Sequence, residues 1–317
     1  MEGGLLVEGG AVRRLPLEKA AQYGGEGFLW MHLEGRDEAD LALVKAHQEI
    51  PDIAAQALVA TETRPRCDAF EDGAIVNLRG PGDVAPSDSD RLVSIRMWVR
   101  RDGVTSLSRR TMTATESATR LFEAGRIRDS GDLVSAFARE ISRQLDPQVS
   151  TLGDRLDACE SELDAGNLYR LRTAIAGIRS EAIAFRRFVA PNRDALVELS
   201  GLGFDWLADD DRLHIREAAD RFARMTEELE AVRERAALLH EQLTDLRTEQ
   251  LDQRSLLISI VAFVFLPLTF ITGLLGMNVA GIPYADEAWA FWGVVGVCIL
   301  IGLAVLAFFA REHWFRR

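Results

Sequence analysis

The chain has 317 residues, a formal net charge of −12 and 27% charged side chains. This length exceeds one small domain, and the charge excludes a protein built mainly of membrane spans. The acidic balance, with no basic patch interleaved with aromatic residues, argues against nucleic acid as a partner. The first residues lack the basic and apolar segments of a secretory signal, so the bulk of the chain is expected in the cytosol.

Residues 1–205 are predicted to form a cytosolic α/β and helical domain. Short β-prone runs bounded by Gly, Pro and Asp lie at 27–33, 74–78, 92–99 and 104–107. Helix formers with periodic apolar residues predict a helix over 38–60. From Thr113 the pattern stays helical, with helices near 130–165 and 167–199 and interruptions expected near Gly166, at Pro191 and at 201–203.

Residues 206–254 are predicted to form the stalk part of one long helix. Apolar residues alternate at spacings of three and four, which is a heptad seam of Phe222, Met225, Leu229, Val232, Ala236, Leu239, Leu243 and Leu246. A core face against the preceding helices explains this seam better than a free coiled coil. Because no Pro or Gly occurs between Asp209 and Phe265, the helix is expected to continue into a membrane, with a length of about 100 Å.

Two membrane spans are predicted at 255–275 and 288–310, separated by an outward loop at 276–287 and followed by a basic tail at 311–317. Neither span contains a charged side chain, and each is long enough to cross roughly 30 Å of hydrocarbon. Arginines flank the outer ends of this pair, whereas the loop carries only Asp286 and Glu287. The positive-inside rule therefore predicts two cytoplasmic termini.

One face of the first span carries the polar side chains. At 100° per residue, one stripe collects Asp252, Ser255, Ser259, Ala262, Leu266, Thr269 and Gly273. A polar stripe in lipid must face other helices or water, and two helices cannot enclose water. The stripe therefore favours several copies around an axis, with first spans inside and second spans outside. Hydroxyls that simply bond back to their own helix are the plainer alternative.

The run Phe265–Gly273, followed by Gly276, Met277 and Asn278, resembles the pore helix of the CorA-type divalent metal transporters. This resemblance implies an α+β membrane protein: a funnel-shaped homopentamer with an N-terminal cytosolic α/β domain, a long helical stalk and two C-terminal transmembrane helices. It also implies an inner-membrane location among lipid, and an entrance in which Asn278 of each copy forms a selectivity ring.

The loop that begins at Asn278 is similar to that of the zinc-transporting ZntB branch, except at Ala280. The resemblance thus implies zinc uptake, either passive or coupled to protons, although the spans offer no Asp, Glu or His as a proton relay. Carboxamide oxygens also suit hydrated magnesium. Tight zinc sites use His or Cys ligands, and the stripe has neither residue. A CorA-type magnesium or cobalt channel therefore stays open, as do nickel and cadmium as transported ions. No cofactor is expected.

Other residues suggest weaker sites. Asp210, His214 and Glu217 have spacings that could place a regulatory metal site on one helix, although first-turn acids also favour the helix dipole. Asp286 and Glu287 could attract cations to the mouth or only solubilise the loop. No phosphate loop, nucleophile elbow or catalytic carboxylate pair is recognisable, so an enzyme is not expected. The alternative of another class is a membrane-anchored coiled-coil scaffold or sensor.

Overall fold

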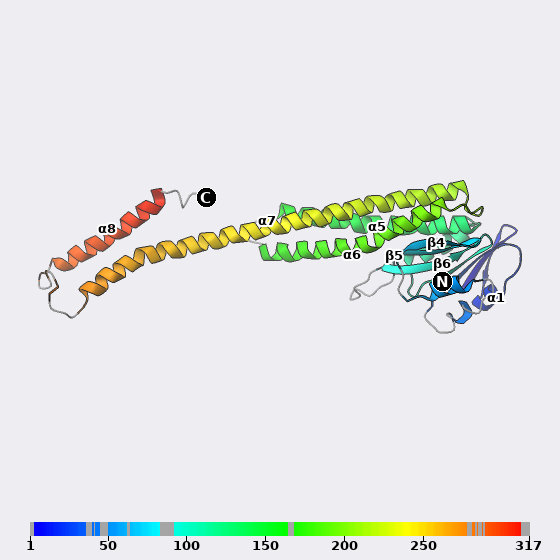
Figure 1. Cartoon of the computed structure of the whole chain (residues 1–317), viewed down its shortest axis with the longest axis horizontal. Helices are drawn as coiled ribbons and strands as arrows, with labels where there is room; N and C mark the ends of the chain where they lie inside the picture. Colours follow the sequence, from blue (N-terminus) through cyan, green and yellow to red (C-terminus); the bar gives the residue numbers. More distant parts are fainter. Residues whose placement is uncertain are drawn as a thin grey trace. The chain divides into compact units, whose positions relative to one another are not determined.

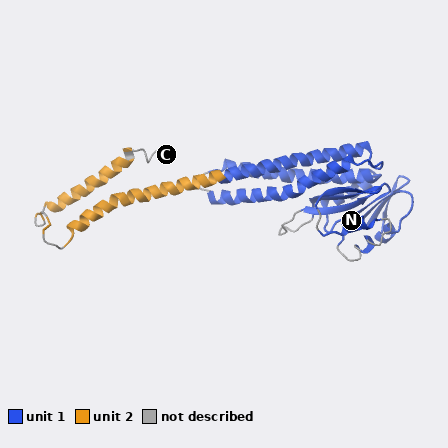
Figure 2. Cartoon of the chain, viewed as in Figure 1, with its two compact units in different colours: residues 1–240 blue, residues 241–317 orange. Residues whose placement is uncertain are grey.

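A computed structural model describes residues 3–35, 40, 42–44, 50–61, 64–82, 92–163, 168–277, 281–282, 284, 287 and 289–311. The chain divides into two compact units, Met1–His240 and Glu241–Arg317, which Figure 2 distinguishes by colour. The boundary falls inside the longest helix, α7 (Asp209–Leu275), so that helix contributes to both units. Figure 1 shows the chain with several of its elements labelled.

The first unit contains a seven-stranded sheet in the order β2-β1-β3-β7-β6-β5-β4. Only the neighbours β3 and β7 run parallel, and the other pairs are antiparallel. The strands are β1 (Gly3–Glu8), β2 (Ala11–Leu15), β3 (Phe28–Leu33), β4 (Arg66–Phe70), β5 (Gly73–Pro81), β6 (Leu92–Val99) and β7 (Gly103–Leu107).

Helices cover both faces of this sheet. Because side chains alternate along a strand, Trp30 of β3 faces α4 (Thr113–Glu123) and α5 (Ser130–Ser161), where its ring meets Phe122 and Phe137 at centroid distances of 5.9 and 5.7 Å. Its neighbour Met31 faces the opposite way, into a core shared with α1 (Leu17–Ala21) and α3 (Asp52–Val59). The sheet is therefore the middle of three layers.

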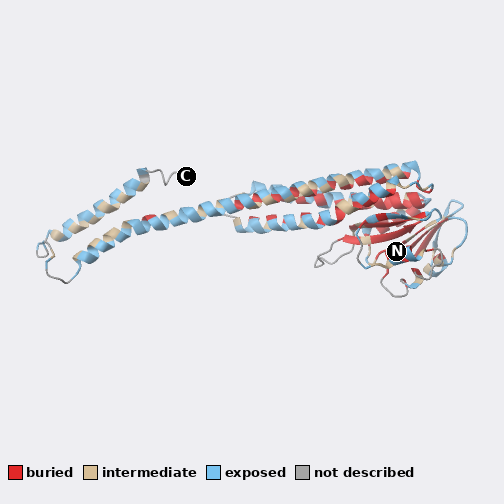
Figure 3. Cartoon of the chain, in the orientation of Figure 1, coloured by how far each residue is buried: buried red, intermediate tan, exposed pale blue. Residues whose placement is uncertain are grey.

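Three long helices bury one stripe each, visible as red bands in Figure 3. They are α5, α6 (Leu168–Gly201) and the part of α7 that lies in the first unit. Within the first unit the α7 stripe is the heptad seam: Phe222, Met225, Leu229, Val232, Ala236 and Leu239 are each at most 4% exposed. Leu243 (3% exposed) and Leu246, which is only half-buried, belong to the part of α7 in the second unit. The interpretation of this seam as a core face is confirmed.

Two helix predictions are wrong. The helix expected over 38–60 is not continuous, because Pro51 is extended (ψ 146°) and α3 begins only after it. Conversely, α6 runs through Pro191, where an interruption was expected. The next residue, Asn192, anchors that turn to β5: its side chain accepts a hydrogen bond from Arg79 N (2.9 Å) and donates one to Arg79 O (2.7 Å). Tertiary packing thus overrides the helix-breaking tendency.

The second unit consists of the last part of α7 and of α8 (Ala290–Arg311). Pro267 lies inside α7 without ending it, and α7 stops at Leu275 just before Gly276. The ring of Phe263 in α7 meets the ring of Phe309 in α8 edge-on, at a centroid distance of 6.2 Å. Asn278, Asp286 and the tail beyond Arg311 lie outside the described residues.

Candidate functional site

Two helices of the second unit are long and apolar enough to cross a membrane. Their most apolar stretches have mean hydropathies of 2.4 and 2.6, and 6% and 0% of these residues are buried. Large apolar side chains such as Phe265 (64% exposed) and Leu300 (70% exposed) therefore have no protein cover in a single chain. Apolar surface on this scale marks a lipid or protein contact.

The polar stripe of α7 is uncovered. Asp252, Ser255, Ser259, Ala262, Leu266, Thr269 and Gly273 are all exposed, and Leu266 is the most exposed large apolar residue of the span at 76%. The less exposed residues of the same span follow another face: Leu256, Ile260, Val264, Pro267, Leu268, Ile271 and Leu275. At 100° per residue the two faces are about 150° apart. The stripe therefore lies within the wide surface that its own chain leaves open, a surface that also includes Ile258, Phe265 and Phe270.

Two hydroxyls of the stripe bond to their own helix. Ser259 Oγ donates to Ser255 O (2.9 Å) and Thr269 Oγ1 donates to Phe265 O (2.7 Å). The alternative that these hydroxyls bond back to their own helix is therefore correct, in that each donates its proton to a helix carbonyl. Each oxygen nevertheless keeps acceptor capacity, because a hydroxyl has two lone pairs beside its proton. With the proton used locally, the stripe presents acceptors, which suit a cation or the water around it.

A kink-prone residue lies beside the stripe. Pro267 has no backbone N–H, so the carbonyl of Phe263 lacks its usual helical donor. Such defects are tolerated in a membrane span when neighbouring helices or water supply partners. Leu266 precedes this point, so the largest apolar side chain of the stripe lies next to the proline.

The described part of the turn between the spans begins with a tight cap. Gly276 N donates to Thr272 O (2.9 Å), and a Cβ at Gly276 would lie 2.9 Å from the same oxygen. Met277 follows and is 47% exposed. At the other end, Glu287 N donates to Tyr284 O (3.1 Å), and the Tyr284 ring lies 5.3 Å from that of Trp289. Glu287 is exposed.

The predicted regulatory residues at the start of α7 meet only in part. His214 Nε2 lies 3.6 Å from Asp210 Oδ2, whereas Nδ1 of the same ring lies 3.5 Å from Glu217 Oε2. One ion takes only one ring nitrogen, so it would bind His214 with Asp210 or with Glu217 but not with both. All three side chains are accessible, which also fits ordinary surface ion pairs.

A tighter acidic cluster, which the sequence did not predict, joins the same turn to α5. Carboxylate oxygens of Asp129, Asp132 and Asp211 all lie within 4.8 Å of one another. Burial, reinforced by the charges of Asp129 and Asp132, raises the pKa of Asp211 to about 6, and burial also raises the pKa of Asp132. Gly131 makes the approach possible, because a Cβ there would overlap the Asp211 carboxylate. Sequence spacing could not reveal this cluster, since Asp211 lies about eighty residues after Asp129 and Asp132.

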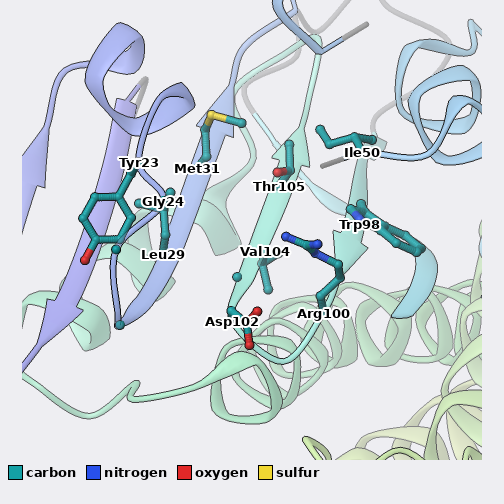
Figure 4. A pocket seen from close by; sticks show the side chains of 13 residues that line it. Tyr23, Gly24, Leu29, Met31, Ile50, Trp98, Arg100, Asp102, Val104 and Thr105 are labelled. Carbon is teal, nitrogen blue, oxygen red and sulfur yellow. The ribbon is translucent and has the colours of Figure 1, made fainter. Parts of the chain in front are cut away.

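The sheet also borders a cavity of about 200 Å³ (Figure 4). Leu29 and Met31 of β3 and Val104 and Thr105 of β7 line it, between Tyr23 on one side and Trp98 on the other. Arg100 and Asp102 are its charged residues. The described lining residues include no His, Cys or Ser.

Comparison with known sequences decides the family. The family described as CorA-like Mg²⁺ transporter protein matches residues 25–311. The chain belongs to the CorA-like family of divalent cation transporters. The resemblance inferred from the pore-helix motif is confirmed, and the match extends far beyond that motif into the sheet domain.

Named relatives of this transporter include zinc transporters. The zinc transport protein ZntB of Pectobacterium carotovorum subsp. carotovorum is 31% identical over 300 residues, which are 94% of this chain and 91% of that protein. The divalent cation transporter CmaX of Pseudomonas aeruginosa is 32% identical over 301 residues, which are 91% of this chain and 88% of that protein.

Solved structures agree on the fold. The full-length CmaX protein superposes with a TM-score of 0.79 at 29% identity, over 98% of this chain and 97% of that one. The complete CorA magnesium transporter from Methanocaldococcus jannaschii gives a TM-score of 0.83 at 19% identity, over 99% of each chain, which bears on the fold alone. The transporter thus has an N-terminal α/β domain, a long helix and two candidate C-terminal membrane helices.

Proposed function

We propose that this transporter moves zinc across the bacterial inner membrane through a pore shared by five copies of the chain. In this arrangement the α7 stripe of each copy faces the axis, α8 lies outside against lipid, and both termini are cytoplasmic. The observation that carries the proposal is the uncovered polar stripe, which lies opposite the better covered face of its own span. An anchor or a scaffold needs no such stripe.

The chemistry of the stripe favours a hydrated ion. Hydroxyl oxygens and a helix carbonyl are weak, neutral acceptors, which can bind the waters of a divalent cation without displacing them. Since the stripe has neither His nor Cys, the proposal of zinc rests on the named relatives and not on a zinc ligand. Magnesium is the second candidate, because oxygen acceptors are its ordinary surroundings.

The entrance is proposed at the turn between the spans. Gly276 and Met277 follow the end of α7, and the carboxamide of the next residue, Asn278, would ring the axis and receive the incoming hydrated ion. Asp286 and Glu287 of each copy would add carboxylates around the mouth. Such a ring raises the local cation concentration and acts over a Debye length of about 10 Å at 0.1 M salt.

Ion flux into proteoliposomes tests the proposal. The purified protein is expected to carry zinc at a rate well above that of protein-free vesicles, with magnesium measured in parallel. An oligomer that folds and inserts but passes neither ion would contradict transport and support the scaffold alternative. If magnesium flux is faster than zinc flux, the proposed pore is retained and magnesium replaces zinc as the transported ion.

The entrance has its own test. Asn278→Ala should abolish flux and leave the oligomer intact on size-exclusion chromatography, because the carboxamide is proposed to contact the ion. Val279→Ala is the matched control, since it truncates the neighbouring residue and should keep wild-type flux. Wild-type flux in a correctly assembled Asn278→Ala protein would remove this residue from the entrance.

A further inference from the structure

A second cavity of about 200 Å³ lies in the sheet domain, remote in sequence from both membrane spans. Four arginines line it: Arg79 of β5, Arg96 of β6, and Arg109 and Arg110, which follow β7. The hydroxyl residues Thr61 and Ser94 also line it, and none of its described lining residues is acidic. The cavity therefore gathers positive charge in a protein whose net charge is −12.

Arg96 is the unusual member of this cluster. Its side chain projects from the middle of the sheet and is only 3% exposed, yet Nε and Nη1 have no hydrogen-bond partner. Burial, together with the charges of Arg109 and Arg79, lowers its pKa to about 10. A guanidinium stays charged even so, and a buried charge without a partner is strongly destabilising. A bound anion would neutralise this buried charge and would accept hydrogen bonds from Nε and Nη1.

Two neighbouring side chains also have buried polar atoms without a hydrogen-bond partner. Asn77 lies directly opposite Arg96 in the β5–β6 register, is 1% exposed, and leaves both side-chain polar atoms without a partner. Arg109 donates from Nη2 to Val59 O (2.9 Å), but its buried Nε has no partner. Native structures rarely leave several buried polar atoms unsatisfied at one place unless a ligand or water satisfies them.

We propose that this cavity binds a phosphate group, with Arg96 as the central ligand. Nε and Nη1 of Arg96 have no partner and lie on two different edges of the guanidinium, so each can donate to a phosphate oxygen, and the unused Nε of Arg109 supplies a further donor. Several arginines around one cavity suit a doubly charged oxyanion better than a single carboxylate. The group belongs either to free phosphate or to a nucleotide whose remainder extends from the cavity, and the two sources are separated by the ATP measurement below.

Binding can be measured on the full-length protein in detergent, in metal-free buffer, by calorimetry and by thermal unfolding. The probes are inorganic phosphate, sulfate and ATP, with chloride at equal ionic strength as the reference. Phosphate is expected to bind and to raise the melting temperature. Arg96→Met should weaken phosphate binding by about tenfold or more, because charge-assisted hydrogen bonds are lost. The same variant should melt higher than wild type without phosphate, since the unpaired charge is gone.

Arg101→Met is the matched control, because Arg101 is an exposed arginine of the same domain that pairs with Asp205. It should leave phosphate binding unchanged. Arg109→Lys keeps the charge but removes the Nε donor, so it should weaken phosphate binding. If Arg96→Met does not fold, this variant tests the phosphate site in its place. ATP that binds more tightly than phosphate supports a nucleotide, and weaker ATP binding supports free phosphate. The proposal is overturned if no oxyanion binds, or if the Arg96 and Arg109 variants bind as wild type does.

Discussion

Asp211 carries a charge that its surroundings disfavour. It is 5% exposed, and its pKa in the folded protein, about 6, is above the ordinary value of 3.8. The folded state therefore binds this proton more tightly than the unfolded state does. Stability from this group is fully present below pH 3.8 and is lost as pH rises through 6.

The variant Asp211→Asn should accordingly raise the melting temperature in metal-free buffer, and more at pH 8 than at pH 5. The amide oxygen of Asn can still accept the hydrogen bond from Ala208 N, so the helix cap is kept. Asp210→Asn is the control, because Asp210 is exposed in the same turn. A gain that is equal at both pH values would contradict the raised pKa.

Leu266 has no cover from its own chain and lies on the proposed pore face. Five such side chains around an axis would form an apolar constriction, which impedes water and ions until the helices tilt. Leu266→Ser should therefore raise the resting zinc leak in proteoliposomes. Leu268→Ser is the depth-matched control on the other face and should leave the leak unchanged. If Leu266→Ser leaks no more than wild type, the constriction lies elsewhere.

At the scale of elements, α7 has two different roles in its two parts. Its first part is held by the buried heptad seam, in which Leu229 is fully buried, whereas Leu238 of the same part is 60% exposed. Leu229→Ala should cost roughly 2–5 kcal/mol of unfolding free energy, because it leaves a cavity in the helical core. Leu238→Ala should stay within about 0.5 kcal/mol. Denaturant unfolding measures both, and equal losses would mean that the seam is not the core.

Elements with strong periodicity could be predicted from the sequence. The heptad seam, the long helices and β3, β5, β6 and β7 all show clear patterns of apolar residues. The sequence analysis missed β1, β2 and β4. The first of these begins with two glycines, and the other two are short and carry several polar residues, so local composition does not favour a strand. Their pairing with neighbours decides their conformation.

The stripe of the candidate site could also be predicted, because it depends only on helical periodicity. The arginine cavity and the acidic cluster could not, since each joins residues from separate elements. One local signal for the cavity existed: Arg96 interrupts the apolar run of β6 at an interior strand position. A charged residue at such a position is rarely buried without a function or a partner.

At the scale of the whole molecule, a single chain leaves its polar stripe and its apolar span surfaces exposed together. Lipid can cover the apolar side chains, but it cannot satisfy a row of hydroxyl acceptors. Association of identical copies around an axis resolves both requirements, because closed symmetry buries one equivalent face from every copy. The oligomer is thus proposed to create the conduction path, which no single chain contains.

Cysteine accessibility tests this central proposal most directly. In a background with Cys67, Cys159 and Cys298 replaced by Ser, Thr269→Cys places a thiol on the stripe. Leu268→Cys places one at nearly the same depth but 100° away, on the less exposed face. A membrane-impermeant, charged thiol reagent should stop zinc flux through Thr269→Cys and leave flux through Leu268→Cys unchanged. Equal flux through both variants after treatment, or block of Leu268→Cys alone, would contradict a pore lined by this face of α7.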